Sequence, residues 1–418
     1  MSAIIYWLAI RLYGVAIHIA AFFNPKAKLF VAGRRGLLSQ IRDALIDERR
    51  PRIWMHCASL GEFEQGRPLL EKLRQKYAHH AFVVTFFSPS GYEVRKDYNG
   101  ADHVFYLPLD SLHNARQFLS IVKPSLCVFV KYELWYFYLS QIASRDIPAI
   151  LVSAIFRKEQ LFFKWYGSLH RRMLRCFTHI FVQDMKSEQL LHNINIDTAS
   201  VAGDTRFDRV LAALEEQQPI PKAEAFCGEA KVIVAGSTWA EDEALLHKTI
   251  TSLPDNWKMI LVPHEVHKEH IQSIMNRYSA TAIRWSQYDG RLKDARVLVI
   301  DTVGMLLQIY CLADVAWIGG GFGKDGVHNV LEAAVYGVPV LHGPIYHQFL
   351  EAKELLESGG SVVTNSAEAT ARQLLLWEKD SLAYQQACTA AKQYVLSKTG
   401  ATEKILRYLE AKKWLTTP

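Results

Sequence analysis

Two series of apolar segments constrain the fold of this chain more than any other feature. Each segment is a near-continuous run of Val, Ile, Leu and Phe, and helical patterns separate successive runs. Such strands are buried on both faces, which is typical of a parallel sheet covered by helices. The first series comprises residues 52–59, 81–88, 103–110, 125–131, 148–154, 179–184 and 200–204, and the second comprises 231–237, 258–264, 297–301, 315–320 and 338–343. The sequence therefore predicts an α/β fold with two doubly wound, Rossmann-like domains facing a central cleft, where ligands bind.

A polar segment that carries two prolines, residues 215–230, separates the two series. We therefore expect an N-terminal domain at residues 31–214, a linker at 215–230 and a C-terminal domain at 231–418. A chain of 418 residues, of which 50% are hydrophobic, is long enough to bury two complete cores.

The N-terminal segment is apolar enough to enter a membrane. Residues 3–23 contain only Arg11 and His18 as interruptions, and the run is long enough to cross a bilayer. Because burying the charge of an arginine near the middle of a membrane span costs free energy, a helix lying in the membrane interface is a second hypothesis. A buried core helix is a third. We expect residues 1–30 to form a membrane anchor. By the positive-inside rule, the basic residues that follow keep the rest of the chain in the cytoplasm; they are Lys26, Lys28, Arg34 and Arg35.

A strand, a glycine-rich loop, a short helix and a second strand follow one another in residues 315–344. Glycines let the backbone approach a ligand closely, and the N-terminus of the helix presents unpaired N–H groups to it. This order predicts an anion site, with phosphate as the natural ligand. The glycines of the loop are Gly319, Gly320, Gly321, Gly323 and Gly326.

The loop can also be compared with two known phosphate-binding motifs. Residues 321–326 match the G-x-G-x-x-G dinucleotide fingerprint, but no acidic residue ends the next strand to hold a ribose. The Walker pattern of a P-loop is also absent, since Asp325 stands where Ser or Thr is required. Asn329 and Glu332 have the spacing of a capping box, so a purely structural role for this pair remains open.

Polar side chains follow the strands at the edge where ligands bind in such sheets. Glu62 opens the helix after the first strand and is placed to take a proton from an acceptor hydroxyl. Ser59 and Glu62 also fit a capping box, which is the structural alternative. Further hydroxyl and glycine positions after strands are Ser88, Ser90, Gly236 and Ser237.

Composition limits the class of partner. The formal net charge of +6 and a pI near 8.8 favour anionic partners, but no long Lys/Arg run indicates nucleic acid. The six cysteines show no metal-ligand or disulfide spacing, so a reducing compartment is expected. No Asp-x-Asp pair is present to hold a metal-bound nucleotide diphosphate, and we expect neither a metal nor another cofactor.

Successive segments of the chain resemble one family. In order they read SLGEFEQGRPLLEKL, FFSPSGYEV, KYELWYF, VAGSTWAEDEALL and GGGFGKDGVHNVLEAAVYGVPVLHGP. They look like the sequence blocks of the 3-deoxy-D-manno-octulosonic acid (Kdo) transferases, which are membrane-anchored GT-B glycosyltransferases of lipopolysaccharide assembly. The resemblance covers roughly residues 1–400. It implies CMP-Kdo as donor, the lipid A disaccharide precursor (lipid IVA) as acceptor, inversion without a metal, and a place at the cytoplasmic face of the bacterial inner membrane.

The resemblance also implies roles for individual residues. Glu62 would be the general base, with the acceptor bound by the N-terminal domain and the donor by the C-terminal domain. The implied donor-binding residues are Gly236, Ser237, His264, Gly323, Gly326, His328, Asn329 and Glu332. The implied acceptor-binding residues are Ser88, Ser90, Glu133 and Arg206.

Two positions depart from the family pattern. The chain has Pro263-His264-Glu265 where the family often has Pro-Arg-His-Pro, so a phosphate contact from that arginine is in doubt. Arg206 stands where the family usually has a lysine, and its planar guanidinium need not make the same contact. An NAD-type oxidoreductase using residues 321–326, and an inactive membrane-associated GT-B binding protein, remain the alternatives.

Overall fold

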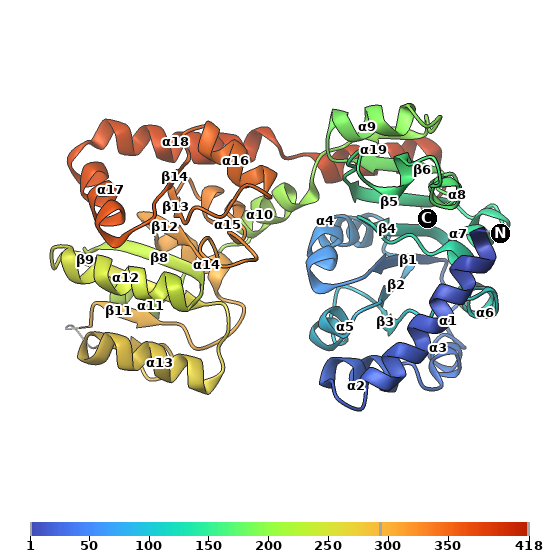
Figure 1. The fold of residues 1–418 in the computed structure, drawn as a ribbon, viewed down its shortest axis with the longest axis horizontal. Coiled ribbons are helices and arrows are strands. Elements are labelled where there is room, and N and C mark those ends of the chain that lie inside the picture. Colours follow the sequence, from blue (N-terminus) through green and yellow to red (C-terminus); the bar gives the residue numbers. More distant parts are fainter. Residues whose placement is uncertain (1, 292–294, 416–418) are drawn as a thin grey trace. The chain divides into compact units, whose positions relative to one another are not determined.

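The computed structural model describes residues 2–291 and 295–415, and the chain forms two compact units. Unit 1 combines Met1–Arg209 with Thr399–Pro418, and unit 2 is Val210–Lys398. Each unit contains a sheet of seven parallel strands (Figure 1). The predicted α/β class with two parallel sheets is therefore confirmed.

In unit 1 the strand order is β3-β2-β1-β4-β5-β6-β7. The strands are β1 (Arg52–Cys57), β2 (Ala81–Phe86), β3 (His103–Tyr106), β4 (Pro124–Val130), β5 (Ala149–Ala154), β6 (His179–Val182) and β7 (Ala199–Val201). The helices are α1 (Ser2–Ala20), α2 (Pro25–Ala32), α3 (Leu37–Ala44), α4 (Leu60–Lys76), α5 (Pro89–Arg95), α6 (Leu112–Val122), α7 (Tyr136–Ala143), α8 (Ser168–Leu174), α9 (Met185–His192) and α19 (Ala401–Lys412). The inner strands β1, β2, β4, β5 and β6 are almost wholly buried, which is why they read as apolar runs, whereas the edge strands β3 and β7 are mostly half-buried.

In unit 2 the strand order is β10-β11-β9-β8-β12-β13-β14. The strands are β8 (Lys231–Thr238), β9 (Trp257–Pro263), β10 (Ala282–Arg284), β11 (Val297–Val299), β12 (Val315–Ile318), β13 (Val340–His342) and β14 (Ser361–Val363). The helices are α11 (Pro221–Cys227), α12 (Ala240–Ser252), α13 (Lys268–Tyr278), α14 (Leu306–Ile309), α15 (Leu331–Ala334), α16 (Leu350–Glu357), α17 (Ala367–Lys379) and α18 (Ser381–Ser397), and α10 (Thr205–Glu215) carries the chain from unit 1 into unit 2. The three-residue edge strands β10 and β14 were not predicted, although β7, an edge strand of the same length, was.

Each sheet has a point where the direction of strand addition reverses. This switch point lies between β1 and β4 in unit 1, and between β8 and β12 in unit 2. In open α/β sheets, ligands bind beyond the carboxyl ends of the strands at such a point. The loops after these four strands are therefore the places to look for a site.

The predicted domain boundaries are corrected in two places. The expected linker, 215–230, belongs to unit 2 and contains α11, because Pro221 starts that helix rather than breaking the chain. The C-terminal residues from Thr399 onward pack with unit 1, not with the predicted C-terminal domain. There α19 contributes to a core with α4, and Asp208 accepts hydrogen bonds from the N–H groups of Gly400 and Thr402, at 2.6 Å each.

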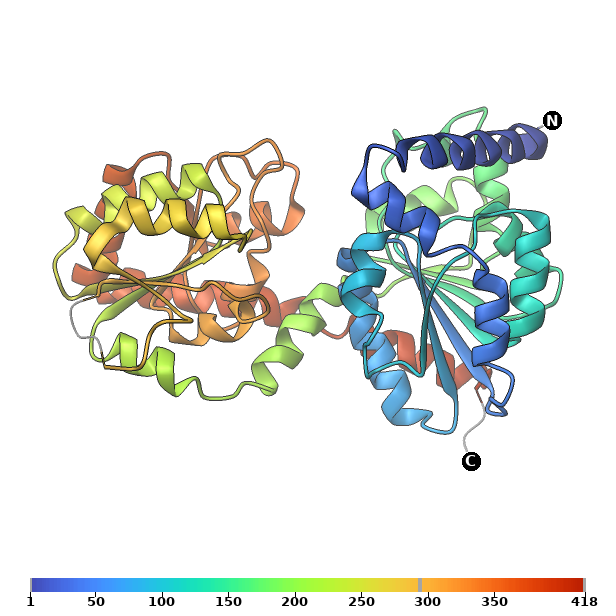
Figure 2. The ribbon, with the colours of Figure 1, turned by 90° about the horizontal axis from the view of Figure 1, so that it is seen from below.

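Helix α1 is long and apolar enough over Ala3–Ala20 to cross a membrane, and one of its faces packs on unit 1. The Tyr6 hydroxyl donates to Asp110 at 2.7 Å, and the Tyr13 ring lies 6.2 Å from the rings of both Phe30 and Phe87. Asp110 and Phe87 follow β3 and β2, so α1 runs along the carboxyl-end edge of the sheet. In Figure 2, α1 and α19 lie on opposite sides of unit 1.

Candidate active site

The loops at the switch point of unit 1 carry two glutamates. Glu62 lies in the first turn of α4, where Ser59 is the N-cap and accepts from the Glu62 N–H at 3.5 Å. The Glu62 carboxylate turns back and accepts from the N–H of Ala58, one residue before the cap, at 2.5 Å. The predicted capping geometry is thus present in a modified form, and the carboxylate remains half-buried at the sheet edge.

The surroundings of Glu62 suit proton transfer. Burial and the nearby carboxylate of Glu133 raise the pKa of Glu62 to about 7, although the Ala58 N–H and the charge of Lys131 act in the opposite direction. A general base works best when its pKa lies near the operating pH. The hydrogen bond from the Ala58 N–H, which gives Glu62 its capping role, does not account for a raised pKa, because that bond lowers it. Lys131 was not among the predicted site residues, because its effect depends on a neighbour far away in the sequence.

Glu133, predicted to contact the acceptor, is 8% exposed and anchored to its neighbours. It accepts from the His56 ring at 2.9 Å and from the Trp135 indole N–H at 2.8 Å. His56 is wholly buried on β1, and its other ring nitrogen lies 2.8 Å from the Thr85 hydroxyl on β2. Glu133 is therefore held rigidly where its charge acts on Glu62. Sequence reasoning missed His56, because a histidine inside an apolar strand gives no local signal.

The remaining predicted acceptor residues divide into two groups. Ser88 caps α5, its hydroxyl lies 3.0 Å from that of Ser90, and its N–H donates to the Ala58 carbonyl at 2.7 Å, beside the Glu62 loop. Arg206 instead pairs with Asp204, with two guanidinium nitrogens at 2.8 Å from the same carboxylate oxygen. The charge of Arg206 is thus paired with Asp204 at the start of α10.

In unit 2, the end of β8 and the loop after β12 meet at the switch point; Gly236 and Ser237 lie within β8, not after it as predicted. A Cβ at Gly236 would overlap the Tyr310 hydroxyl, and Ser237 adopts a left-handed backbone with φ of +52°. Buried Asp242 joins the two loops, since it accepts from the N–H of Trp239 at 3.0 Å and from that of Gly320 at 2.9 Å. In the sequence, Asp242 cannot be told from an ordinary acidic residue of a first helical turn.

Most glycines of the loop after β12 serve packing within the protein. A Cβ at Gly319 would overlap the Ser237 carbonyl, and one at Gly321 would lie 2.6 Å from the Gly343 nitrogen. Gly320 and Gly326 have φ of +88° and +77°, which favour glycine. Gly323 alone of the five has room, its nearest neighbour lying at 3.6 Å. At four of the five positions a side chain is thus excluded by packing within the protein, and the approach of a ligand to this loop stays a prediction.

Three rings lie together in the segments that follow β8, β9 and β12 of unit 2. The Trp239 and His328 rings each stack on His264, at 4.7 and 4.5 Å between centroids. The Trp239 indole N–H donates to His328 at 2.9 Å. Burial and the neighbouring His264 lower the pKa of His328 to about 4, so its ring is neutral near pH 7. His264 is exposed and open to a ligand.

Asn329 and Glu332 lie together at the start of α15, a helix of only four residues. The Asn329 side chain accepts from the Leu331 N–H at 3.2 Å, and its amide donates to Glu332 at 3.0 Å. The expected capping box is not formed, because Val330 is the N-cap of α15 and no side chain caps it; Asn329 instead closes a local turn with Leu331 and holds the Glu332 carboxylate through its amide. Glu332 also lies near Tyr310 and Tyr336, where its charge helps burial to raise the pKa of both hydroxyls.

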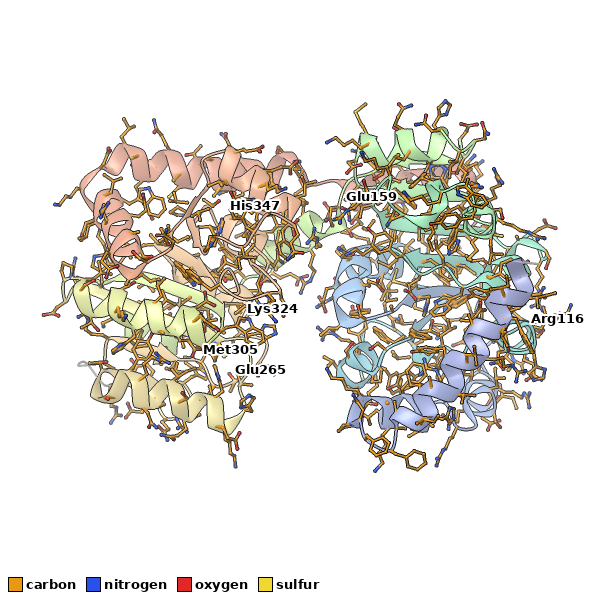
Figure 3. The ribbon with its side chains drawn as sticks, in the orientation of Figure 1. Arg116, Glu159, Glu265, Met305, Lys324 and His347 are labelled. Atoms are coloured by element: carbon orange, nitrogen blue, oxygen red, sulfur yellow. The ribbon has the colours of Figure 1, made fainter. Side chains whose placement is uncertain are left out.

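In Figure 3, the labelled residues of unit 2 each follow a different strand, and together they show where the carboxyl-end edge of its sheet lies. The exposed Lys324 lies there in the glycine loop, a cation that sequence reasoning did not single out. Within residues 2–291 and 295–415, no group of three or more His, Cys, Asp or Glu side chains is placed to hold a metal ion. The labelled residues of this edge are Glu265, Met305, Lys324 and His347.

The position of the glycine loop bears on the dinucleotide alternative. That fingerprint belongs to the first strand–helix turn of its fold. Here the first strand of unit 2 is β8, and the glycine loop follows β12, on the other side of the switch point.

Comparison with known proteins decides the family. A family model described as 3-deoxy-D-manno-octulosonic-acid transferase (kdotransferase) matches residues 31–209. A 3-deoxy-D-manno-octulosonic acid transferase of Haemophilus influenzae is 26% identical, over 86% of this chain and 86% of the relative. One of Chlamydia trachomatis is 28% identical, over 90% and 92%. This chain belongs to the Kdo transferases. It is a glycosyltransferase of lipopolysaccharide assembly.

Solved structures similar to this Kdo transferase agree on the fold alone. A UDP-GlcNAc 2-epimerase of Neisseria meningitidis aligns with a TM-score of 0.62 and 15% identity, over 86% of this chain and 100% of the other. A glycosyltransferase of Rickettsia africae aligns with a TM-score of 0.54 and 14% identity, over 87% and 99%. The two parallel-sheet units thus resemble GT-B glycosyltransferases.

Proposed function

We propose that this Kdo transferase moves Kdo from CMP-Kdo onto the phosphorylated disaccharide precursor of lipid A, with Glu62 as general base. The observation that carries the proposal is the half-buried Glu62 carboxylate at the switch point of unit 1, with its pKa raised to about 7. Glu62 takes the proton of an acceptor hydroxyl while that oxygen attacks the anomeric carbon of Kdo. The bond from this carbon to the CMP phosphate oxygen breaks, and CMP leaves with the electron pair. Attack opposite to the leaving group inverts the anomeric centre.

The donor half of the proposal belongs to unit 2. CMP-Kdo is anionic, and α12 presents the N-terminus of a 13-residue helix beside Gly236 and Ser237. His264 and Lys324 are exposed at the same edge and supply donors for a phosphate or carboxylate oxygen. Neutral His328, oriented by Trp239, completes the polar wall. These groups favour the departing CMP phosphate by stabilising its charge.

The acceptor half belongs to unit 1, and α1 supports a lipid acceptor. One face of α1 packs along the sheet edge that carries Glu62, whereas its other face exposes large apolar side chains, among them Leu12 at 61% and Ile19 at 58%. A helix docked in this way suits an interfacial position at the membrane better than a full span. Enzyme and lipid would then meet at the cytoplasmic face of the inner membrane.

The test is transfer by the purified protein. With CMP-Kdo and the lipid A precursor, we expect release of CMP and a lipid product heavier by one or more Kdo residues in a mass spectrum. CMP release without a heavier lipid would contradict the acceptor assignment. If the protein releases no CMP and forms no product, the inactive binding protein is favoured. Binding of NADH would revive the oxidoreductase alternative.

A further inference from the structure

A groove of about 440 Å³ lies between α1, α2 and the turn that follows β2. Its lining is mostly apolar, with Ala16, Ala20 and Ala27 among the residues contributed by the two helices and Phe87 contributed by the turn. Small side chains on the helices leave this space open. The polar residues of the lining lie in the α1–α2 connection, in α2 and in the β2–α5 turn.

The aromatic wall of the groove is held in place by a half-buried arginine, Arg34. The Arg34 guanidinium lies 3.6 Å from the Phe30 ring centroid, and it donates to the Phe87 carbonyl at 2.7 Å. The Phe30 and Phe87 rings contact edge to face at 5.2 Å, and Tyr13 packs on both. Because these rings are fixed by one another and by Arg34, the groove is a formed feature of unit 1.

The same wall reaches Glu133 and the loop that holds Glu62. Phe87 packs on Trp135 at 4.5 Å between ring centroids, and the Trp135 indole N–H donates to Glu133. The next residue, Ser88, also lines the groove and bonds through its N–H to Ala58, whose own N–H holds Glu62. A molecule in the groove is therefore directed toward the hydroxyl-activating site.

The rim of the groove has the charge and the surroundings of a lipid headgroup site. Lys26 lines the groove and is exposed, and in the described parts of the chain it forms no ion pair. Phe22 and Phe23, at 84% and 87% exposed, lie just before it at the end of α1. An apolar chain with an anionic group at its end matches this combination.

We propose that this groove binds one acyl chain of the phosphorylated glycolipid acceptor, with Lys26 facing a phosphate, so that the sugar hydroxyl is presented to Glu62. The inference rests on the proposed lipid acceptor and adds a recognition site for its chain. The groove would distinguish the acylated acceptor from a soluble sugar, because only the acylated molecule has a chain that fills it.

Filling the groove tests the proposal. Ala16→Trp and Ala27→Trp place an indole in the space, and Ala9→Trp is the matched control because Ala9 is exposed on α1 outside the groove. We expect the filled variants to lose about tenfold or more in kcat/KM on the acylated acceptor, through lost apolar contact. On the soluble, deacylated phosphodisaccharide they should match the parent, and Ala9→Trp should match it on both. Unchanged kcat/KM on the acylated acceptor, or an equal loss on both acceptors, would overturn the groove assignment.

A photo-crosslinking experiment gives a readout that does not require transfer. The parent protein is irradiated with acceptor lipid that carries a diazirine in one acyl chain, and adducts are mapped by mass spectrometry. We expect adducts on residues 13–30 and 87–89, absent in Ala16→Trp. Adducts only on the outward face of α1, or equal groove labelling by a diazirine phosphatidylethanolamine, would refute the acceptor site. Failure of the proposed reaction would appear separately, as absence of Kdo transfer by the parent.

Discussion

At the residue scale, Glu62 serves as a cap and is proposed as the base. Its contact with the Ala58 N–H secures the start of α4, yet burial and Glu133 keep its pKa near neutrality. A cap alone would gain from a low pKa, because an ionised carboxylate accepts the stronger hydrogen bond. The raised pKa is thus the feature that a structural role leaves unexplained.

Replacement of Glu62 by Gln separates the two roles. Glutamine still has a carbonyl oxygen to accept from the Ala58 N–H, so the fold should persist, but it cannot take a proton. We expect kcat to fall by about 10²–10⁴-fold. The Kd for CMP should remain that of the parent. Glu64→Gln, in the same helix but paired with arginines, is the control. A Glu62→Gln enzyme with near-parental kcat would leave only the cap.

The pH dependence of the reaction should report the same group. Because only ionised Glu62 can act as a base, kcat/KM should be full above pH 7 and should decline as the pH falls through about 7. Glu133→Gln removes the negative charge that raises this pKa, so the acid limb of the residual activity should move to lower pH. An acid limb at the same pH in parent and variant would show that Glu133 does not tune the base.

At the scale of elements, the glycine loop is a packed joint between β8, β12 and β13. Gly319 and Gly321 lie against backbone atoms of Ser237 and Gly343, and Asp242 binds the loop from α12. The site loops of unit 2 are therefore held by backbone contacts and one buried carboxylate. The glycine loop, which the sequence predicts to approach a ligand, also packs closely enough to hold the neighbouring loops of this sheet edge in place.

Two alanine substitutions in this loop should behave differently. Ala at position 320 would take a left-handed backbone and overlap the Gly326 carbonyl, so Gly320→Ala should cost about 2 kcal/mol or more of unfolding free energy. Gly323→Ala has its nearest neighbour at 3.6 Å and a backbone that alanine accepts, so its stability should be close to that of the parent. Chemical denaturation measures both. Equal stability of the two variants would contradict the packing role.

At the scale of the whole molecule, the C-terminal helix completes the unit formed by the N-terminal half of the chain. The side chains of Ile405 and Leu409 are fully buried in the core that α19 shares with α4. Lys404 donates to the Ala202 carbonyl from the same helix. Unit 1 therefore cannot complete its core until α19 is present.

Truncation of one side chain in α19 should weaken unit 1. Ile405→Ala removes a buried side chain and should cost about 2–5 kcal/mol. Hydrogen exchange should rise in peptides from residues 52–154, although residue 405 follows the whole of unit 2 in the sequence. Leu382→Ala, at a position 67% exposed on α18, is the control and should change little. Increased exchange confined to unit 2 would contradict this assignment of α19.

The long central strands and the two-sheet class could be predicted from the sequence because burial on both faces leaves a local mark. The runs at β1, β4, β8 and β9 are mostly apolar, whereas β10 and β14 lie in no such run. The position of Glu62 in the first turn after β1 could be predicted in the same way, since the residues beside it in the chain form its motif, and its role as base stays a prediction.

Other features depended on residues far apart in the sequence, and only the tertiary structure decided them. Asp242 binds the N–H of Gly320, 78 residues away, and His56 meets Glu133, 77 residues away. The pKa of Glu62 follows from the same kind of long-range neighbour, and α19 joins unit 1 because its buried face fits there. A local pattern records how a segment is buried, but which partners bury it is set by the packing of the whole chain.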